Sequence, residues 1–130
     1  KFVGQLMNEE SPVINGDGNY SRDFTYIDNV IQANLLSLVT TNKKAINTVY
    51  NIAYGDRNTL NDLMVYLKHY LSEFDSNISN IDVIYGPNRA GDIPHSHASV
   101  DKAKENLNYK PQFTLQEGLK EVVNWYWKNL

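Results

Sequence analysis

The chain has no cysteine among its 130 residues, which excludes disulfides, thiolate zinc sites and cysteine nucleophiles. It has no long apolar run of the kind that spans a membrane. A net charge of only −3 argues against a basic face for nucleic acid. We therefore expect one globular domain of a cytoplasmic protein whose ligands include neither membrane nor nucleic acid.

The first ten residues do not begin with methionine, and they have the apolar pattern of a helix end, with Phe2-Val3 followed by Leu6-Met7. This pattern indicates the last part of a helix in a longer structure. We interpret residues 1–130 as a piece from the C-terminal part of a longer protein.

Several amphipathic patterns predict helices. The strongest follows Thr59, which has Asp62 three residues later and apolar residues at helical spacing as far as Phe74. A capping box at Thr114 and Glu117 begins the last helix. Two further helices are expected, one capped by Asp28 or Asn29 and one running from Ser99 to Leu107.

Short runs rich in β-branched and aromatic residues predict strands at Pro12–Ile14, Phe24–Ile27, Thr48–Ala53 and Ile81–Tyr85. Together with the helical patterns they predict a small α+β domain with a few short strands and about four or five helices.

The run Gly16-Asp17-Gly18-Asn19-Tyr20-Ser21 nearly matches a dinucleotide-binding loop. We reject that interpretation because the third glycine is replaced by Ser21, and because a strand pattern follows where the fingerprint needs a helix N-terminus. The run is expected to form a hairpin turn instead.

Two arginines lie in loops near carboxylates: Arg22 directly precedes Asp23, and Arg89 stands three positions before Asp92 in the run Arg89-Ala90-Gly91-Asp92. The planar guanidinium fits a phosphate in two-point contact. The aspartates could accept hydrogen bonds from sugar hydroxyls or hold the arginines in place. From spacing alone, a site for a discrete anion and a pair of ordinary surface arginines remain open.

Other chemistry finds little support. Asp92, His95 and His97 suggest a metal site, but no partner carboxylate has a familiar ligand spacing, and His95 is expected to order its loop. None of the nine tyrosines has a lysine four residues later, so the Tyr-x-x-x-Lys pair of short-chain dehydrogenases is absent. We predict no catalytic residue and no metal ligand in this chain.

Four motifs, in order, resemble those of extended short-chain dehydrogenases that act on nucleotide sugars, the NAD-dependent epimerase/dehydratase family. They lie at residues 16–29, 50–63, 89–104 and 111–126. The run 51–63 and the His95-Ser96 pair most resemble UDP-N-acetylglucosamine 4-epimerases.

The resemblance implies that residues 1–130 form the C-terminal substrate-binding domain, inactive alone, which folds against an N-terminal Rossmann domain that holds NAD. It implies a UDP-sugar substrate, hydride removal from sugar C4 and its return to the other face. It also implies a parent enzyme that dimerises through helices of the other domain.

Residue by residue, Arg22 and Arg89 match the arginines that contact the diphosphate in this family. Asp92 matches the carboxylate that reaches the nucleotide ribose, and Ser96 a position lining the sugar pocket. Pro94 departs from the pattern, in which a basic residue is common. UDP-glucose 4-epimerase, dTDP-glucose dehydratase and UDP-glucuronate decarboxylase are alternatives within the family. A non-catalytic module that binds a nucleotide or a protein is the alternative outside it.

Overall fold

The computed structural model describes all residues from Lys1 to Leu130. Its helices are α1 (Phe2–Met7), α2 (Ile27–Val39), α3 (Leu60–Ser72), α4 (Asp101–Leu107) and α5 (Leu115–Asn129), with short 3-10 turns η1 (Lys43–Ala45) and η2 (Ser76–Asn80). Its strands are β1 (Val13–Asn15), β2 (Ser21–Arg22), β3 (Asn58–Thr59) and β4 (Ile84–Gly86). The predicted α+β class, with several helices and few short strands, is confirmed.

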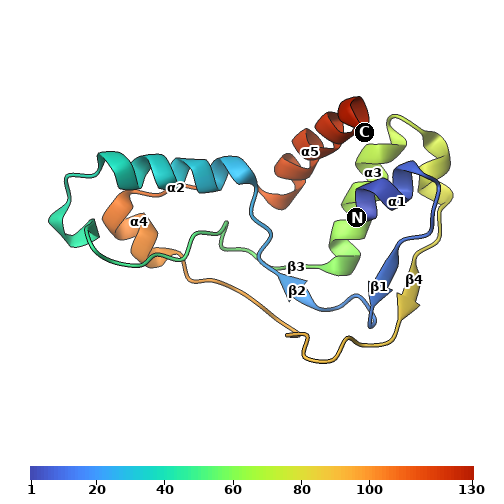
Figure 1. Cartoon of the computed structure of the whole chain (residues 1–130), viewed down its shortest axis with the longest axis horizontal. Helices are drawn as coiled ribbons and strands as arrows, with labels where there is room; N and C mark the ends of the chain where they lie inside the picture. The colour runs from blue at the N-terminus through green and yellow to red at the C-terminus, as the bar shows by residue number, and fades with distance from the viewer.

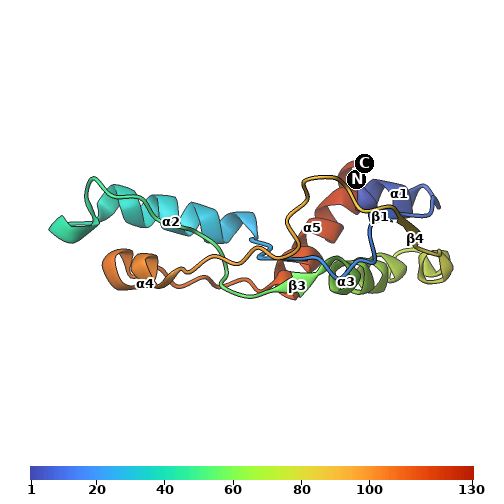
Figure 2. The ribbon, with the colours of Figure 1, turned by 90° about the horizontal axis from the view of Figure 1, so that it is seen from below.

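The molecule is elongated, with two lobes joined by a narrow middle (Figure 1). One lobe contains α1, α3, α5, β1 and β4, and the other contains α2 and α4. The second view shows the same separation in a thin profile (Figure 2). Strand β1 pairs in parallel with β4, while β2 pairs antiparallel with β3 in the middle of the molecule.

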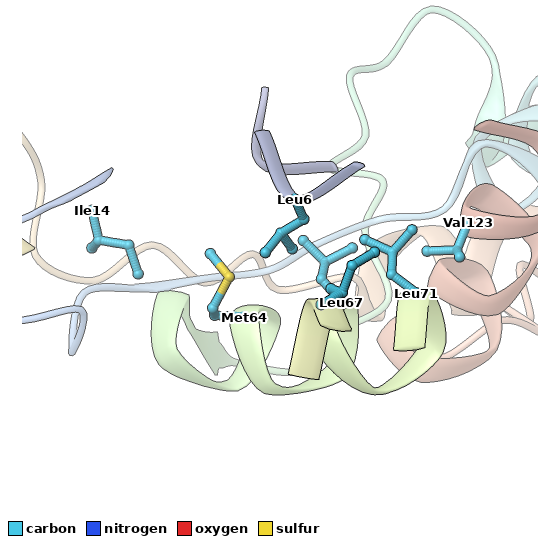
Figure 3. Close-up of a cluster of buried hydrophobic side chains, with 7 residues drawn as sticks. Leu6, Ile14, Met64, Leu67, Leu71 and Val123 are labelled. Atoms are coloured by element: carbon cyan, nitrogen blue, oxygen red, sulfur yellow. The ribbon is translucent and has the colours of Figure 1, made fainter. Parts of the chain in front are cut away.

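The first lobe is organised around α3. Leu67 and Leu71 of this helix are buried, as their helical spacing predicts, and they meet Leu6 of α1 and Val123 of α5 (Figure 3). Because Leu67 and Leu71 are four residues apart, they lie on the same face of α3 and form part of its apolar stripe. The helix thus unites segments from both ends of the chain.

The second lobe has a smaller core of Ala33, Ala103 and Tyr109. The Tyr109 hydroxyl donates a hydrogen bond of 2.9 Å to the carbonyl oxygen of Ala53. Burial raises the pKa of the Tyr109 phenol, and the nearby Asp23 carboxylate adds to this rise. The phenol therefore stays protonated, and its hydrogen bond joins the segment of Tyr109 to that of Ala53.

The predicted N-cap at Thr59 and the predicted capping box at Thr114 are both present, and Thr59 with Asp62 also forms a capping box. Thr59 and Asp62 exchange hydrogen bonds at the start of α3, and Thr114 and Glu117 do so at the start of α5. Hydrogen bonds from the Thr59 hydroxyl and backbone N–H lower the pKa of Asp62. Those from the Thr114 backbone N–H and hydroxyl lower the pKa of Glu117. Both carboxylates thus satisfy donors that a helix start leaves free.

The region before α2 differs from its prediction. The expected strand at Phe24–Ile27 is wrong, since the strand is Ser21–Arg22 and Ile27 already begins α2. The Tyr26 ring packs 4.8 Å from that of Phe113. It also fills the space beside Gly118 so closely that a Cβ there would lie 2.7 Å from the Tyr26 Cβ. This packing overrides the local strand preference.

The expected helix cap at Asp28 or Asn29 is also wrong. The residue before α2 is Tyr26, which makes no side-chain capping bond. Asn29 is 1% exposed, and its side chain bonds to the backbone of Gln112 and Phe113. Asparagine is a residue type that often caps helices, which is why the sequence suggests a cap here. The actual partners of Asn29 are more than 80 positions away, and the local sequence carries no sign of them.

Three smaller differences concern ends and connections. The turn after β1 is no hairpin, because β1 and β2 belong to different sheets. The strand expected at Ile81–Tyr85 begins only at Ile84. Helix α4 begins at Asp101, and Ser99 donates its hydroxyl to the Asp101 carboxylate.

The segment Thr48–Ala53, expected to be a strand, pairs with no other strand in the chain. Its side chains still alternate as in a half-buried strand. Tyr50 and Ile52 pack on the core of the second lobe, whereas Val49 is 84% exposed. The prediction of a paired strand is therefore wrong for this chain, although the periodicity that suggested it is present.

Candidate functional site

All four residues predicted to form the site line one open pocket of about 380 Å³. They are Arg22, Arg89, Asp92 and Ser96, and the remaining lining residues are Ala90, Gly91 and Ile93. The loop after β4 runs back past β2, which brings Arg89 to the same hollow as Arg22. The geometry therefore favours a common site over two unrelated surface arginines.

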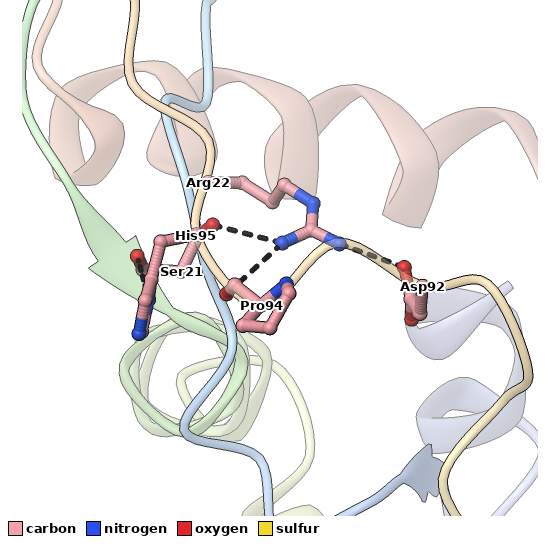
Figure 4. Close-up of polar contacts among 5 residues, drawn as sticks. All are labelled: Ser21, Arg22, Asp92, Pro94 and His95. Atoms are coloured by element: carbon pink, nitrogen blue, oxygen red, sulfur yellow. Dashed lines mark hydrogen bonds and ion pairs between the residues drawn. The ribbon is translucent and has the colours of Figure 1, made fainter.

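The Arg22 guanidinium is held in one orientation (Figure 4). Its Nη1 donates to the carbonyl oxygens of Ser21, at 2.9 Å, and Pro94, at 3.4 Å. Its Nη2 donates to Asp92 Oδ1 at 2.8 Å. Both side chains of this ion pair remain 30% exposed. The arginine is thus oriented and still open to a ligand.

Strand β2 fixes the backbone position of Arg22. Ser21 pairs with Thr59 of β3 on one side and bridges to His95 on the other. The Ser21 N–H donates to the Pro94 carbonyl oxygen at 2.9 Å, and the Ser96 N–H donates to the Ser21 carbonyl oxygen at 3.0 Å. The loop that carries Asp92 and Ser96 is therefore joined directly to the strand that carries Arg22.

Arg89 differs from Arg22 in its surroundings. It is exposed, and its guanidinium makes no ion pair or hydrogen bond within the chain. A turn follows it, in which the Asp92 N–H donates to the Arg89 carbonyl oxygen at 3.2 Å and Gly91 has a φ of +79°. Because that φ suits glycine and strains other residues, Gly91 permits the turn that brings Asp92 back toward Arg22.

The two aspartates named with the arginines have different tasks. Asp92 holds the Arg22 guanidinium, as one of the two expected possibilities states. Asp23 does not reach either arginine, and instead its two carboxylate oxygens accept from the Gly55 N–H at 3.3 and 3.1 Å. Asp23 therefore anchors the loop before β3, and Asp92 is the carboxylate of the pocket.

The glycine loop at residues 16–18 has no room for a dinucleotide. Gly16 and Gly18 both have positive φ, and the space where a Cβ would stand is filled by the side chains of Asn88 and Asn61 respectively. The loop leads into β2 and not into a helix N-terminus, which a bound pyrophosphate needs. This loop is therefore not a dinucleotide-binding site.

The metal alternative has no arrangement to support it. Asp92 is engaged by Arg22, and His95 Nδ1 lies 2.9 Å from Ser21 Oγ. No three histidine or carboxylate side chains lie together as a metal would require. His95 instead links its loop to β2, which is the ordering task predicted for it.

Among the lining residues that the sequence does not predict, Ile93 has the largest side chain. Ile93 is 63% exposed and lies on the pocket wall between Asp92 and Pro94. An exposed apolar side chain beside polar groups suits the face of a sugar or base. An isolated apolar residue inside a polar loop was the available signal, but a single such residue is common on protein surfaces.

Comparison with known proteins adds a family. A model of the GDP-mannose 4,6-dehydratase family matches residues 1–122. The fold is similar to that of UDP-glucose 4-epimerase from Thermotoga maritima, in its structure with UDP-glucose. The TM-score is 0.84 and the identity 36%, over 98% of this chain and 38% of that one.

Two other solved structures are similar over the same region. UDP-N-acetylglucosamine 4-epimerase from Methanobrevibacter ruminantium, in complex with UDP-N-acetylmuramic acid, has a TM-score of 0.82 and 37% identity, over 100% of this chain and 39% of that one. UDP-glucuronic acid 4-epimerase from Bacillus cereus, in complex with UDP-glucuronic acid and NAD, has a TM-score of 0.84 and 25% identity, over 99% and 39%. The chain thus spans less than half the length of each.

Proposed function

Because the chain belongs to the GDP-mannose 4,6-dehydratase family, we propose that it is the UDP-sugar-binding part of an NAD-dependent nucleotide-sugar 4-epimerase. One observation carries the proposal. Arg22, Arg89, Asp92 and Ser96 were selected by their match to family motifs, and all four line one pocket. The two arginines are 67 positions apart in the sequence, so their meeting is not a consequence of chain proximity.

The chemistry of the pocket suits a nucleoside diphosphate. Arg22 and Arg89 are assigned to the diphosphate, because guanidinium groups bind phosphate oxygens through paired N–H donors. Asp92 uses only Oδ1 for Arg22, which leaves Oδ2 for a ribose hydroxyl. Ser96 is assigned to the sugar pocket. Contacts remote from the reacting carbon would orient the sugar, which is how binding energy serves such a reaction.

The preferred substrate is proposed to be UDP-N-acetylglucosamine or its 4-epimer, or the corresponding uronic acids. The residue run 51–63 and His95-Ser96 support this choice, and so does the likeness to the Methanobrevibacter ruminantium enzyme. UDP-glucose 4-epimerase, dTDP-glucose dehydratase and UDP-glucuronate decarboxylase are the rival activities.

A product assay with the full-length protein separates these activities. With UDP-N-acetylglucosamine we expect its 4-epimer to form, with kcat/KM at least about tenfold above that for UDP-glucose, since a site built for a polar substituent discriminates against its absence. Faster turnover of UDP-glucose or UDP-glucuronic acid would reassign the substrate. No turnover, together with no UDP binding, would favour the non-catalytic module.

A second domain is proposed to complete the enzyme and to hold NAD, since the loop at residues 16–18 is not a dinucleotide-binding loop. The chain supports this by its unusually open surface. It exposes 8275 Å², whereas a compact monomer of 14.9 kDa exposes roughly 7,000 Å². Along α2, Ile31, Leu35 and Leu38 are 45%, 57% and 81% exposed. Such an apolar stripe at helical spacing calls for a partner surface.

The segment Thr48–Ala53 supports the same proposal. None of its backbone N–H groups donates a hydrogen bond within the chain, although its side chains alternate as in a strand. Backbone N–H groups left free in an extended segment can pair with the edge of another sheet. We assign its partner to the edge of the second domain's sheet.

Hydrogen exchange tests that assignment. In the full-length protein without ligand, we expect about half of the amides from Val49 to Ala53 to exchange at least about a hundredfold more slowly than those of Asn88 and Ala90, since pairing on one edge protects alternate residues. The amides of Asn88 and Ala90, in the exposed loop after β4, are the internal control. Equal exchange in the two segments would contradict the sheet partner.

A further inference from the structure

Ser21 and His95 form a hydrogen bond that the proposed ligand contacts do not use. Ser21 Oγ lies 2.9 Å from His95 Nδ1, and the two residues are 74 positions apart. Ser21 is 6% exposed, and His95 is exposed. Neither residue lines the pocket, although each directly precedes a residue that does. The bond therefore joins the two segments that supply the site, from outside the site.

The backbone explains which side the pair occupies. Residues 94–96 run in parallel beside β2 and extend the small β2–β3 sheet. In extended chains successive side chains point to opposite faces, so Ser21 and His95 share the face opposite to Arg22 and Ser96. Figure 4 agrees, with Ser21 and His95 on one side of the Arg22 guanidinium and Asp92 on the other.

Register is the property that this pair controls. A slip of one residue between the loop and β2 would turn Ser96 away from the pocket. It would also replace the Pro94 carbonyl oxygen, which Arg22 contacts, and shift Asp92 from its 2.8 Å contact with Arg22. Because the backbone bridge consists of a single residue pair, it specifies register weakly. A side-chain bond between two specific residues specifies it well.

We propose that Ser21 and His95 are positioning residues for substrate binding. Their hydrogen bond holds the loop of Asp92 and Ser96 at β2 in the register that directs Arg22 and Asp92 to the same ligand. The inference rests on the proposed function, because it assigns to this pocket the binding of a nucleoside diphosphate. It adds two residues that act through Arg22 and Asp92 and do not touch the ligand.

The test measures UDP binding to the full-length protein by calorimetry. Ser21→Ala and His95→Ala are each expected to weaken UDP binding about three- to tenfold, the usual consequence of losing one neutral hydrogen bond. The double variant should bind no more weakly than the weaker single variant, because both changes remove the same bond. Ser21→Thr keeps a hydroxyl, and His95→Asn keeps a polar atom close to the position of Nδ1, so both variants should bind UDP to within about twofold of the unaltered protein.

His97→Ala is the matched control, since His97 is exposed in the same loop and has no partner within the chain. In steady-state assays Ser21→Ala and His95→Ala should raise KM and leave kcat within about twofold, because the pair is remote from the reacting carbon. A general loss of folded protein would lower apparent kcat instead, and would not be reversed by His95→Asn.

The outcomes separate the inference from the proposed function. If the unaltered protein does not bind UDP, the proposed function fails and the inference fails with it. If the unaltered protein binds UDP while His95→Ala binds as well as His97→Ala, only the inference is overturned. Additive losses in the double variant would also overturn it. His95 lies in an exposed loop, so this variant decides the question even if Ser21→Ala does not fold.

Discussion

Replacing Arg22 by alanine is expected to weaken UDP-sugar binding by the full-length protein about 10- to 150-fold. Losing a charge-assisted hydrogen bond costs about 1.5–3 kcal/mol, and 1.4 kcal/mol corresponds to a factor of ten. The change would also leave the Asp92 carboxylate without its partner, in the pocket proposed to bind the diphosphate. Repulsion between these anions acts in the same direction.

Arg89→Ala should have a smaller effect, because Arg89 is not held in place before the ligand arrives. Arg22 has three hydrogen bonds that orient it, so it loses less freedom on binding. Arg57→Ala is the matched control, since Arg57 is exposed in a loop outside the pocket. Calorimetry with UDP measures all three. Unchanged UDP affinity in both Arg22→Ala and Arg89→Ala would refute the assigned roles.

Replacing Asn29 by alanine is expected to lower the free energy of unfolding by about 2–4 kcal/mol. Asn29 Oδ1 accepts from the N–H groups of Gln112, at 2.8 Å, and Phe113, at 3.1 Å, and its Nδ2 donates to the Phe113 carbonyl oxygen at 2.8 Å. Alanine would leave all three backbone groups without these partners. Gln112 is exposed, so water can reach part of the vacated space, and the loss is less than the sum of three unsatisfied groups.

Urea unfolding measures this loss, with Asn34→Ala as the control. Asn34 is an exposed asparagine on the same helix, α2, so its replacement should be neutral or slightly stabilising through helix propensity. Asn29→Asp keeps the acceptor and loses the donor, and an intermediate loss is expected. Equal stability of Asn29→Ala and Asn34→Ala would show that the three hydrogen bonds of the Asn29 side chain contribute nothing to stability.

The parts of the fold that follow local rules could be predicted from the sequence. Thr59 and Thr114 begin helices because a hydroxyl and an acidic residue three positions later satisfy the first backbone donors. Leu67 and Leu71 are buried because helical spacing places them on one face. The four site residues follow instead from their match to the family motifs, because spacing alone left two ordinary surface arginines as an open alternative.

The failures all depend on distant partners. Phe24–Ile27 has the composition of a strand. Tyr26 instead packs on Phe113 and Gly118 and is the residue that directly precedes helix α2. Asn29 has the composition of a cap, yet its partners lie at residues 112 and 113. Thr48–Ala53 has the alternation of a strand, and no strand in the chain pairs with it. Local composition describes what a segment favours, and long-range contact decides which preference is realised.

The pocket also has a place in the order of folding. Arg22 and Asp92, whose ion pair crosses it, are 70 positions apart in the sequence. Closing so long a loop costs chain entropy that the pocket's few bonds do not offset, so it must wait until the surrounding helices have already closed most of that distance. A nucleotide that binds as proposed would therefore find the pocket complete only after those helices have folded, and would act on the folded molecule without guiding its folding.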